Sequence, residues 1–494
     1  MARRGELQEV LLDDDAAAQD ADPVAATGRR RVPVTWLVGG VLVLGAGLGA
    51  TQWVVTERER AADAALARVP GVISPVDEVL VAGRRVPARE AGALFGYAGG
   101  MVDRAADGSQ TYTRFGGAWS TLLLGPVAVL AEQEPSTIVG GSWCVDDVVP
   151  GGDIGSAARV VCLISDGAVV VEPSGSLERV PASAHEVVVL STAAGRVLAR
   201  WPVDAGDTLA VLPDDTVAIA YSSPAGTTVA GFDTLSGEQR WSRTDPFVDG
   251  VTYSENDLSA SVYRAGDLLA YSPTGGPLRL LSAEGDVVRD LTEEVGTGAH
   301  GMGWATDVDG TISWQVTTTD GVRTTFLSPD GDPAADVTIG GSRFDTALDD
   351  GSVPGLVLTR DDMLRGWDAD TGSRRWSNDT VIDASHALIM RGKVFVGSTS
   401  GLRALDGATG QVLWSTKPGR GWTLGSTMFT DGRHLLVPVT AVTAGDRSQL
   451  VAYDPATGQE VFRADFPAGV SQVVPAGRSL VGLDIAANEY VVLG

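Results

Sequence analysis

A frame of eleven residues recurs four times in the chain and constrains the fold more than any other feature. Each copy reads Ala or Gly, one residue, Asp, two residues, Ser or Thr, Gly, three residues, and then Trp or Phe. The copies are residues 231–241, 366–376, 404–414 and 452–462. Four occurrences of so constrained a frame are not chance, so each copy is interpreted as the same part of a repeated structural unit.

The residue types in the frame predict a tight turn followed by a strand. Its aspartates can accept hydrogen bonds from backbone N–H groups two or three residues further on. Its glycines allow the positive φ that ends such a turn without a Cβ penalty. The predicted turn residues are Asp233 and Gly237, Asp368 and Gly372, Asp406 and Gly410, and Asp454 and Gly458.

The aromatic residue that closes each frame is predicted to pack between successive units. These residues are Trp241, Trp376, Trp414 and Phe462. Because they hold one position of the outgoing strand, their rings would point to one face at one height. We expect the small residue that opens the frame to leave room for a neighbour's ring. Stacking on a ligand is the alternative use of the rings, but their fixed position favours packing.

Weaker copies of the turn extend the repeat. Turns that end at Gly195, Gly285 and Gly331 resemble the frame, with the aromatic displaced to Trp201 in the first and lost in the other two. Units thus recur roughly every 40–50 residues, the range of propeller blades. Between the turns lie short β-prone runs, about four per unit, and helical periodicity is almost absent.

These features predict an all-β fold, a single β-propeller of four-stranded blades. Seven turns, followed by about three more strands at the C-terminus, favour eight blades if an N-terminal strand completes the last one. Seven blades is the alternative. The candidates for the completing strand are residues 78–81 and 120–124.

The segment from Gly392 to Trp414, GKVFVGSTSGLRALDGATGQVLW, resembles the tryptophan-docking repeat of the pyrroloquinoline-quinone-like (PQQ-like) propellers. That superfamily includes quinoprotein alcohol dehydrogenases and the propeller lipoprotein of the outer-membrane barrel assembly machinery. The resemblance is strong over the four frames and extends through the weaker turns over about residues 150–494. It implies a fold more than an activity.

An uncharged apolar run, residues 34–55, precedes the repeats. It is long enough to cross a bilayer as a helix, with Trp36 and Trp53 near its ends and Arg29, Arg30 and Arg31 before it. It predicts an uncleaved signal anchor of a single-pass cell-membrane protein, with the N-terminus cytoplasmic and the propeller extracytoplasmic. A cleaved signal peptide is the alternative.

The predicted organisation therefore has four parts. They are a disordered cytoplasmic tail over residues 1–33, a transmembrane anchor over 34–55, a juxtamembrane helix or stalk over 56–125 that merges into the first blade, and the propeller over 126–494.

The two cysteines, Cys144 and Cys162, are a candidate disulfide, because the predicted compartment is oxidising. The bond would close a loop of about 18 residues and stabilise the fold by roughly 3 kcal/mol through the lost entropy of the unfolded chain. Two buried free thiols are the alternative.

Charge and motifs argue against several function classes. A net charge of −26 disfavours a nucleic-acid partner. The four histidines and two cysteines show no spacing typical of metal or haem sites. The dehydrogenases of the resembling superfamily hold their quinone with a calcium ion, a catalytic aspartate and typically a vicinal disulfide, and this chain has no Cys-Cys pair. We expect that the protein is not an enzyme and that it has no catalytic residue, metal ion or cofactor.

The function class that remains is the binding of other molecules. A propeller on one membrane helix would present a broad face to proteins or polymers of a bacterial cell envelope. We expect a non-catalytic scaffold. The alternatives are a membrane-tethered, PQQ-dependent quinoprotein oxidoreductase and a transmembrane sensor that signals to residues 1–33.

Overall fold

The computed structural model describes residues 64–494, except for 70, 88–99, 106, 115–118, 128–136, 140–141, 148–156, 172–176, 224, 248–259, 275–277, 292–300, 307–310, 382–384, 399–400, 426, 443–447 and 488. The chain divides into two compact units, residues 1–61 and 62–494, and only the second is described below. Within the described residues helix is confined to residues 64–66 and to the 3₁₀ helix η3 (Pro333–Ala335). The predicted all-β fold is confirmed.

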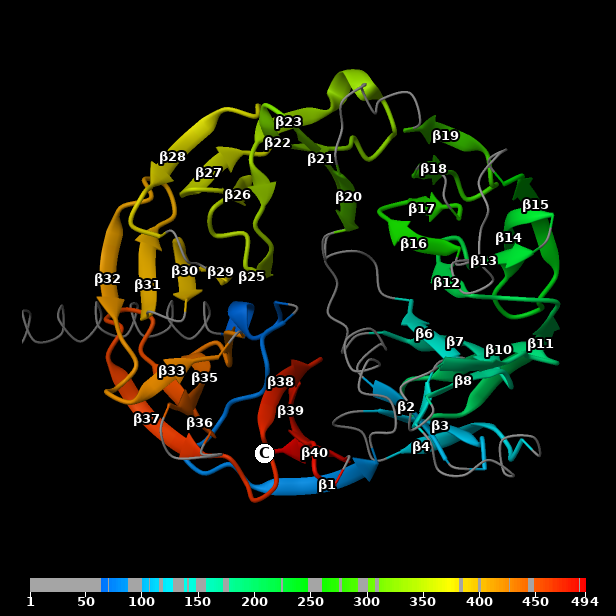
Figure 1. Cartoon of the computed structure of the whole chain (residues 1–494), viewed down its shortest axis with the longest axis horizontal. Coiled ribbons are helices and arrows are strands. Elements are labelled where there is room, and N and C mark those ends of the chain that lie inside the picture. Colours follow the sequence, from blue (N-terminus) through cyan, green and yellow to red (C-terminus); the bar gives the residue numbers. More distant parts are fainter. Residues whose placement is uncertain are drawn as a thin grey trace, which may run out of the picture. The chain divides into compact units, whose positions relative to one another are not determined.

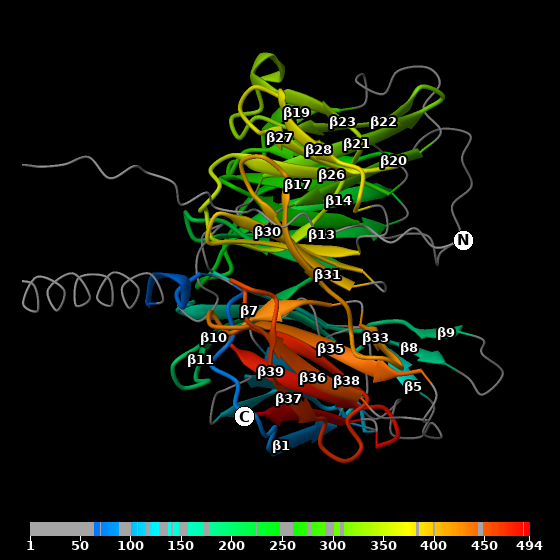
Figure 2. The same ribbon diagram turned by 90° about the vertical axis from the view of Figure 1, so that its left-hand side faces the viewer.

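The described strands form eight sheets of four or five strands and two of three strands. Figure 1 shows the sheets of this unit following one another around a ring in chain order, and Figure 2 shows them from the side. The number of blades stays a prediction, since the three-stranded sheet β2–β3–β4 stands beside eight larger sheets.

The N-terminal sheets are β2 (Gly100–Arg104), β3 (Gln110–Arg114) and β4 (Ser120–Leu124); β5 (Thr137–Val139), β8 (Ala168–Val171) and β9 (Leu177–Val180); β6 (Ser142–Asp146), β7 (Arg159–Ser165), β10 (His185–Ser191) and β11 (Val197–Val203); and β12 (Thr208–Val211), β13 (Thr216–Ser223), β14 (Gly226–Asp233) and β15 (Gln239–Asp245).

The middle sheets are β16 (Ser261–Ala265), β17 (Leu268–Ser272), β18 (Arg279–Leu281) and β19 (Val287–Asp290); β20 (Gly301–Thr306), β21 (Ile312–Thr318), β22 (Gly321–Phe326) and β23 (Val337–Gly340); and β24 (Ser342–Arg343), β26 (Leu356–Arg360), β27 (Leu364–Asp368) and β28 (Arg374–Asn378). The last of these is called the β24–β28 sheet.

The C-terminal sheets are β25 (Thr346–Asp349), β29 (His386–Met390), β30 (Lys393–Ser398), β31 (Gly401–Asp406) and β32 (Val412–Thr416), called the β29–β32 sheet; β33 (Trp422–Leu424), β35 (Leu435–Ala441), β36 (Ser448–Tyr453) and β37 (Glu460–Asp465), with β34 (Phe429–Thr430) on β35; and β1 (Ala82–Pro87), β40 (Glu489–Leu493), β39 (Ser479–Asp484) and β38 (Gln472–Ala476).

The cores lie between the faces of successive sheets. One cluster joins Leu358 and Trp376 of the β24–β28 sheet to Ile389 and Val394 of the β29–β32 sheet. Sheets covered on both faces explain why strands such as β30, KVFVGS, are almost continuously buried rather than alternating. The outer strands keep an alternation of exposed and covered side chains, as in β15.

An N-terminal strand completes the last sheet, as predicted, but it is β1. Ala82 of β1 pairs with Leu493 of β40, and the antiparallel ladder runs to Pro87 opposite Glu489. The candidate 78–81 only leads into this strand, where the Val81 N–H donates to the Gly494 carbonyl at 2.8 Å. The other candidate, residues 120–124, is β4 and pairs with β3.

The segment interpreted as a stalk, residues 56–125, contributes directly to the propeller sheets. Strands β1 to β4 all lie within it. The side chains of Leu66, Val72 and Ile73 are buried in the cores of the C-terminal sheets. The propeller therefore begins well before residue 126, because a closed ring of sheets needs strands from the N-terminal side of the repeats.

The predicted tail over residues 1–33 and the predicted span over 34–55 lie outside the described residues. Within residues 64–494 as described, no helix has the length and apolar character needed to cross a membrane.

Candidate functional site

The turns predicted from the frame form with the predicted contacts. Oδ1 of Asp406 accepts hydrogen bonds from the N–H groups of Ala408 at 3.1 Å and Thr409 at 2.8 Å, and Gly410 has φ +68°. Asp233, Asp368 and Asp454 accept bonds from their own turns in the same way, and Gly237, Gly372 and Gly458 have φ between 65° and 71°.

These contacts lower the pKa of the turn aspartates, because each hydrogen bond favours the ionised carboxylate. Backbone and hydroxyl donation from Ser236 lowers the pKa of Asp233 to about 2. The Arg375 guanidinium, followed by Thr371, lowers the pKa of Asp368 to about 2. The turn aspartates therefore act as structural acceptors.

The frame tryptophans cross to the next sheet and donate a hydrogen bond there. The indole N–H of Trp376 donates to the carbonyl of Gly407 at 2.9 Å, and that of Trp241 to Ala283 at 2.6 Å. Trp414 donates to Pro455 at 3.3 Å. In each case the acceptor is the residue that follows the first residue of the next turn, and we call this arrangement a docked junction.

Two further docked junctions lie outside the frame. Trp119 donates to the carbonyl of Thr192 at 3.0 Å, and Trp201 donates to Thr234 at 3.1 Å. Trp201 was predicted as a displaced aromatic, whereas Trp119 was not predicted, because no copy of the frame precedes it. Phe462 has no N–H donor, and its ring packs edge-on against His434 at 5.4 Å between centroids.

The expected role of the small residue that opens the frame was wrong in one respect. A Cβ at Gly231 would lie 2.3 Å from the ring of Trp241, and one at Gly366 would lie 2.3 Å from Trp376. Both rings belong to the glycine's own cross-strand partner. The neighbour's ring instead covers the turn glycine, since a Cβ at Gly410 would lie 2.6 Å from Trp376.

One junction replaces the indole by an ion pair. Arg289 pairs with Leu280 across β18 and β19, in the register that Trp241 has with Gly231. Its guanidinium is buried and donates to both carboxylate oxygens of Asp336, at 2.8 and 2.5 Å. A bidentate contact of this kind suits a buried arginine, because it satisfies the charge and several donors together.

The junction between the β20–β23 and β24–β28 sheets lacks a docked ring altogether. Val337 pairs with Phe326, in the position that Trp376 has opposite Gly366. A Cβ at Gly372 would meet Cγ1 of Val337 at 3.2 Å, where the equivalent Gly410 meets an indole. The valine therefore covers the turn glycine without filling the junction.

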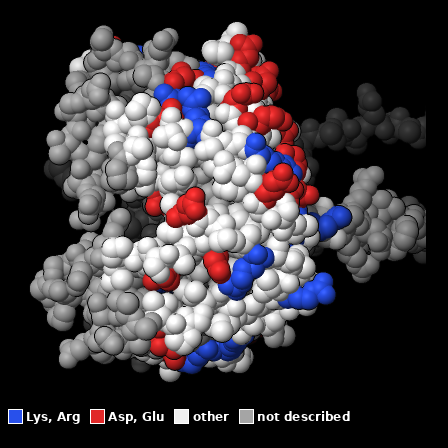
Figure 3. All heavy atoms as spheres, turned by 90° about the vertical axis from the view of Figure 1, so that its right-hand side faces the viewer, with Lys and Arg blue, Asp and Glu red and all other residues white. Residues whose placement is uncertain are grey.

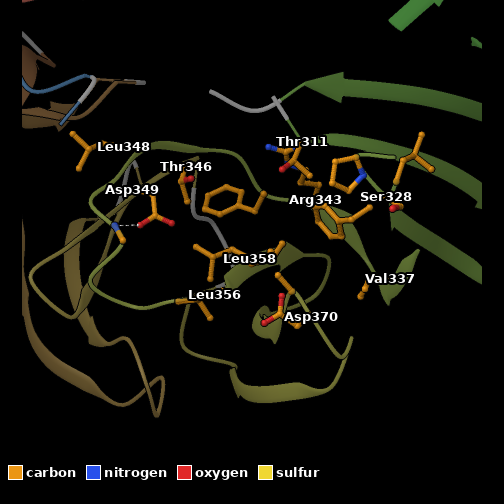
Figure 4. Close-up of a pocket in the computed structure, with 18 of the residues that line it drawn as sticks. Thr311, Ser328, Val337, Arg343, Thr346, Leu348, Asp349, Leu356, Leu358 and Asp370 are labelled. Atoms are coloured by element: carbon orange, nitrogen blue, oxygen red, sulfur yellow. Dashed lines mark hydrogen bonds between the residues drawn. The ribbon is translucent and has the colours of Figure 1, made fainter. Parts of the chain in front are cut away.

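A pocket of about 720 Å³ opens at this junction, and we call it the junction pocket. Its walls include Phe326, Val337, Phe344, Leu356 and Leu358, and Ala369 of the frame turn also lines it. Figure 4 shows Leu356 and Leu358 on one side of the pocket and Ser328 and Val337 on the other. Pockets of this volume with mostly apolar walls are typical of small-molecule sites.

Charged groups also line the junction pocket. The nearly buried Arg343 donates from Nη1 to the Ser313 hydroxyl at 2.7 Å, and its Nε lies 3.1 Å from Oδ1 of Asp345. Burial lowers the pKa of Arg343. Oδ1 of Asp349 accepts the N–H of Gly351 at 2.8 Å, the contact drawn in Figure 4. The pocket thus combines apolar walls with polar groups that are held in place.

The remaining candidate residues are structural. Cys144 of β6 lies opposite Cys162 of β7 and is joined to it by a disulfide, with 4.0 Å between the Cα atoms. A group of partly exposed aromatics lies on the first strands of three sheets, where Tyr263 contacts Trp143 and Trp304. Within the described segments no cluster of three His, Cys, Asp or Glu could hold a metal ion.

Comparison with known proteins matches residues 304–464 and 400–492 to the family described as outer membrane protein assembly factor BamB. No curated protein matches the chain.

Among solved structures, BamB from Moraxella catarrhalis is 17% identical, covers 62% of this chain and 88% of its own, and has a TM-score of 0.36. Dihydro-heme d1 dehydrogenase NirN in complex with DHE is 16% identical, covers 80% of each chain and has a TM-score of 0.38. The Dos1 propeller is 13% identical, covers 78% and 97%, and has a TM-score of 0.37. The repeated frame, its docked turns and the family match over residues 304–492 identify this chain as a β-propeller of PQQ-like repeats.

Proposed function

We propose that this chain is a membrane-anchored, extracytoplasmic propeller that binds proteins or polymers of the cell envelope as a non-catalytic scaffold. The observation that carries the proposal is the match of residues 304–492 to the repeat of a protein assembly factor. The use of the frame supports it as well. Its aspartates, glycines and tryptophans are engaged in turns and junctions, which leaves the surface to recognise partners.

The outer strands offer a surface suited to a protein partner. Val412 and Leu413 of β32 and Val461 of β37 are exposed, although they are aliphatic and lie on strands at the edge of their sheets. An edge strand has unpaired backbone groups that can bind another chain, and exposed apolar side chains strengthen such a contact. Acidic side chains gather along one border of the molecule in Figure 3, which would favour a basic partner.

A photo-crosslinking amino acid at Val412, in the full chain in its native membranes, tests the scaffold proposal. Val412 is 43% exposed, and Arg374 is an exposed residue at the equivalent position of β28. We expect a discrete light-dependent adduct from position 412, lost in the presence of Leu413→Glu, and none from position 374. Equal adducts from both positions, or none from either, would contradict the use of this edge.

The quinoprotein alternative is tested with the same purified full chain in detergent. Pyrroloquinoline quinone and calcium are added, and thermal unfolding is followed together with dye-linked alcohol oxidation. The scaffold proposal expects no saturable stabilisation and no turnover. Saturable stabilisation with turnover would make the protein an oxidoreductase and overturn the proposal.

The location is part of the proposal and rests on the apolar run over residues 34–55 and on the disulfide. Disulfides persist in oxidising compartments. After cells are quenched with acid and their proteins are denatured, Cys144 and Cys162 should resist alkylation by a maleimide until a reductant is added. Thiols that react without reductant would place the propeller in the cytoplasm.

A further inference from the structure

We propose that the junction pocket binds a planar aromatic group that carries one N–H donor, as indole does. The pocket lies between the β20–β23 and β24–β28 sheets, at the one described frame turn that receives no docking aromatic. This inference goes beyond the proposed scaffold function and does not depend on it, because it concerns a site inside the propeller wall.

The register of the strands supplies the first argument. Val337 occupies the place of the docking tryptophan, as its pairing with Phe326 and its contact with Gly372 show. The receiving side is unchanged. Gly372 keeps φ +65°, against +68° for Gly410, and the turn aspartate Asp368 keeps its hydrogen bonds. This turn therefore keeps the geometry that accepts an indole in the docked junctions, although Val337 provides no indole.

The hydrogen-bond acceptor supplies the second argument. In the docked junctions the indole N–H donates to the residue after the first turn residue, as Trp376 does to Gly407. Ala369 is that residue in the receiving turn, and its N–H donates to Gly355 as that of Gly407 does to Gly392. Ala369 lines the junction pocket. An N–H donor on the ligand would replace the missing indole contact.

The walls supply the third argument. Phe326, Phe344, Leu356 and Leu358 give an aromatic and aliphatic lining. The guanidinium of Arg360 already lies 5.2 Å from the ring centre of Phe344, so that ring is held in place. Flat apolar walls favour a planar ring, because it buries apolar area on both faces.

The charges of the lining disfavour an anionic ligand. Arg343 is paired with Asp345, whereas Asp349 and Asp370 bring two carboxylates to the lining. An anionic ligand would meet those carboxylates. The neutral aromatic group has two sources, a free small molecule or a tryptophan side chain from another protein, and the probes below distinguish them.

The test is ¹⁹F NMR titration of 5-fluoroindole into the purified full chain in detergent. We expect saturable binding with a Kd of roughly millimolar or tighter, the range open to so small a ligand. Val337→Trp should abolish binding by placing the chain's own indole in the pocket, and Val337→Ala should retain it. Binding that Val337→Trp leaves unchanged, or no saturable binding to the wild type, would overturn the proposal.

Further probes test the N–H contact and the source. On the wild type, 1-methylindole should bind roughly three- to tenfold more weakly than indole, the value of one lost hydrogen bond. Equal affinities would refute the Ala369 contact. N-acetyltryptophanamide should bind if the pocket receives a tryptophan side chain, and only free indoles should bind if it receives a small molecule. If neither class of probe binds, the pocket is not an aromatic site.

A second variant covers the case in which Val337→Trp does not fold. Ala335→Trp fills the same pocket from η3 without altering the strand pair, and far-UV circular dichroism reports whether each variant is folded. We expect a folded Ala335→Trp protein to bind 5-fluoroindole at least tenfold more weakly than the wild type. Unchanged binding by that folded variant would overturn the proposal. These results are separate from the crosslinking at Val412, so either proposal can fail alone.

Discussion

Two junctions of the propeller share their turns and register but differ in one side chain. Between the β24–β28 and β29–β32 sheets, Trp376 is 6% exposed and donates a hydrogen bond into the next turn. Between the β20–β23 and β24–β28 sheets, Val337 holds the same place beside the junction pocket. Both receiving turns have the same geometry, with or without a docked ring. The turns and the strand register therefore specify the propeller fold, and the aromatic ring fills the space between two sheets.

The largest expected effect breaks the docked junction. Trp376→Ala should lower the free energy of unfolding by roughly 3–5 kcal/mol, because a buried ring and its hydrogen bond are both lost. Val337→Ala should cost only about 1 kcal/mol, since that site already borders a pocket. Urea unfolding measures both. Equal losses would show that the two junctions are packed alike.

A pH titration tests whether the buried histidine in the sheet that receives Trp376 is neutral. His386 of β29 is 8% exposed, and burial lowers its pKa to about 4. Between about pH 6.5 and 4 the unfolded state binds more protons than the folded state. Stability should therefore be full above about pH 6.5 and fall by roughly 3 kcal/mol as the pH decreases to about 4.

His386→Gln should remove most of that pH dependence, measured by unfolding at fixed pH values. Burial also lowers the pKa of His185, so His185→Gln is the matched control and should remove less. An unaltered slope in His386→Gln would refute a neutral buried imidazole.

The smallest expected difference separates conformation from packing at the turn glycines. Alanine at Gly372 or Gly410 meets the same left-handed backbone and should cost about 1–2 kcal/mol. At Gly410 the new methyl also meets the Trp376 ring, which should add about 1 kcal/mol or more. Thermal unfolding compares the two variants, and the difference should vanish in a Trp376→Ala background.

The fold was predictable because its signal repeats. The frame identifies turn, strand and docked ring together. All four copies form the turn contacts in the structure, and the three copies that end in tryptophan also dock their rings. Trp119 was not predicted because the residues before it, TYTRFGGA, lack the aspartate and the Ser-Gly or Thr-Gly pair of the frame. The completing strand was misplaced by a few residues because AGRRVP carries no alternation of apolar and polar residues.

The junction pocket was only partly predictable. The sequence shows that the turn ending at Gly331 lacks an aromatic, but η3 lengthens that turn and hides the equivalence of Val337 and Trp376. The equivalence of Arg289 and the frame tryptophan is also hard to recognise, because the turn before Arg289 is one residue shorter than the frame turn. A pocket also depends on what surrounding side chains leave unfilled, which no single frame encodes.

The pairing of β1 with β40 sets the order of events during synthesis. Ala82 leaves the ribosome early, whereas its partner Leu493 follows only after the strands of all the other sheets have been synthesised. The last sheet therefore cannot assemble until β40 has emerged, and β1 stays unpaired while the residues between the two strands are synthesised. An unpaired strand of that kind is a natural substrate for chaperones.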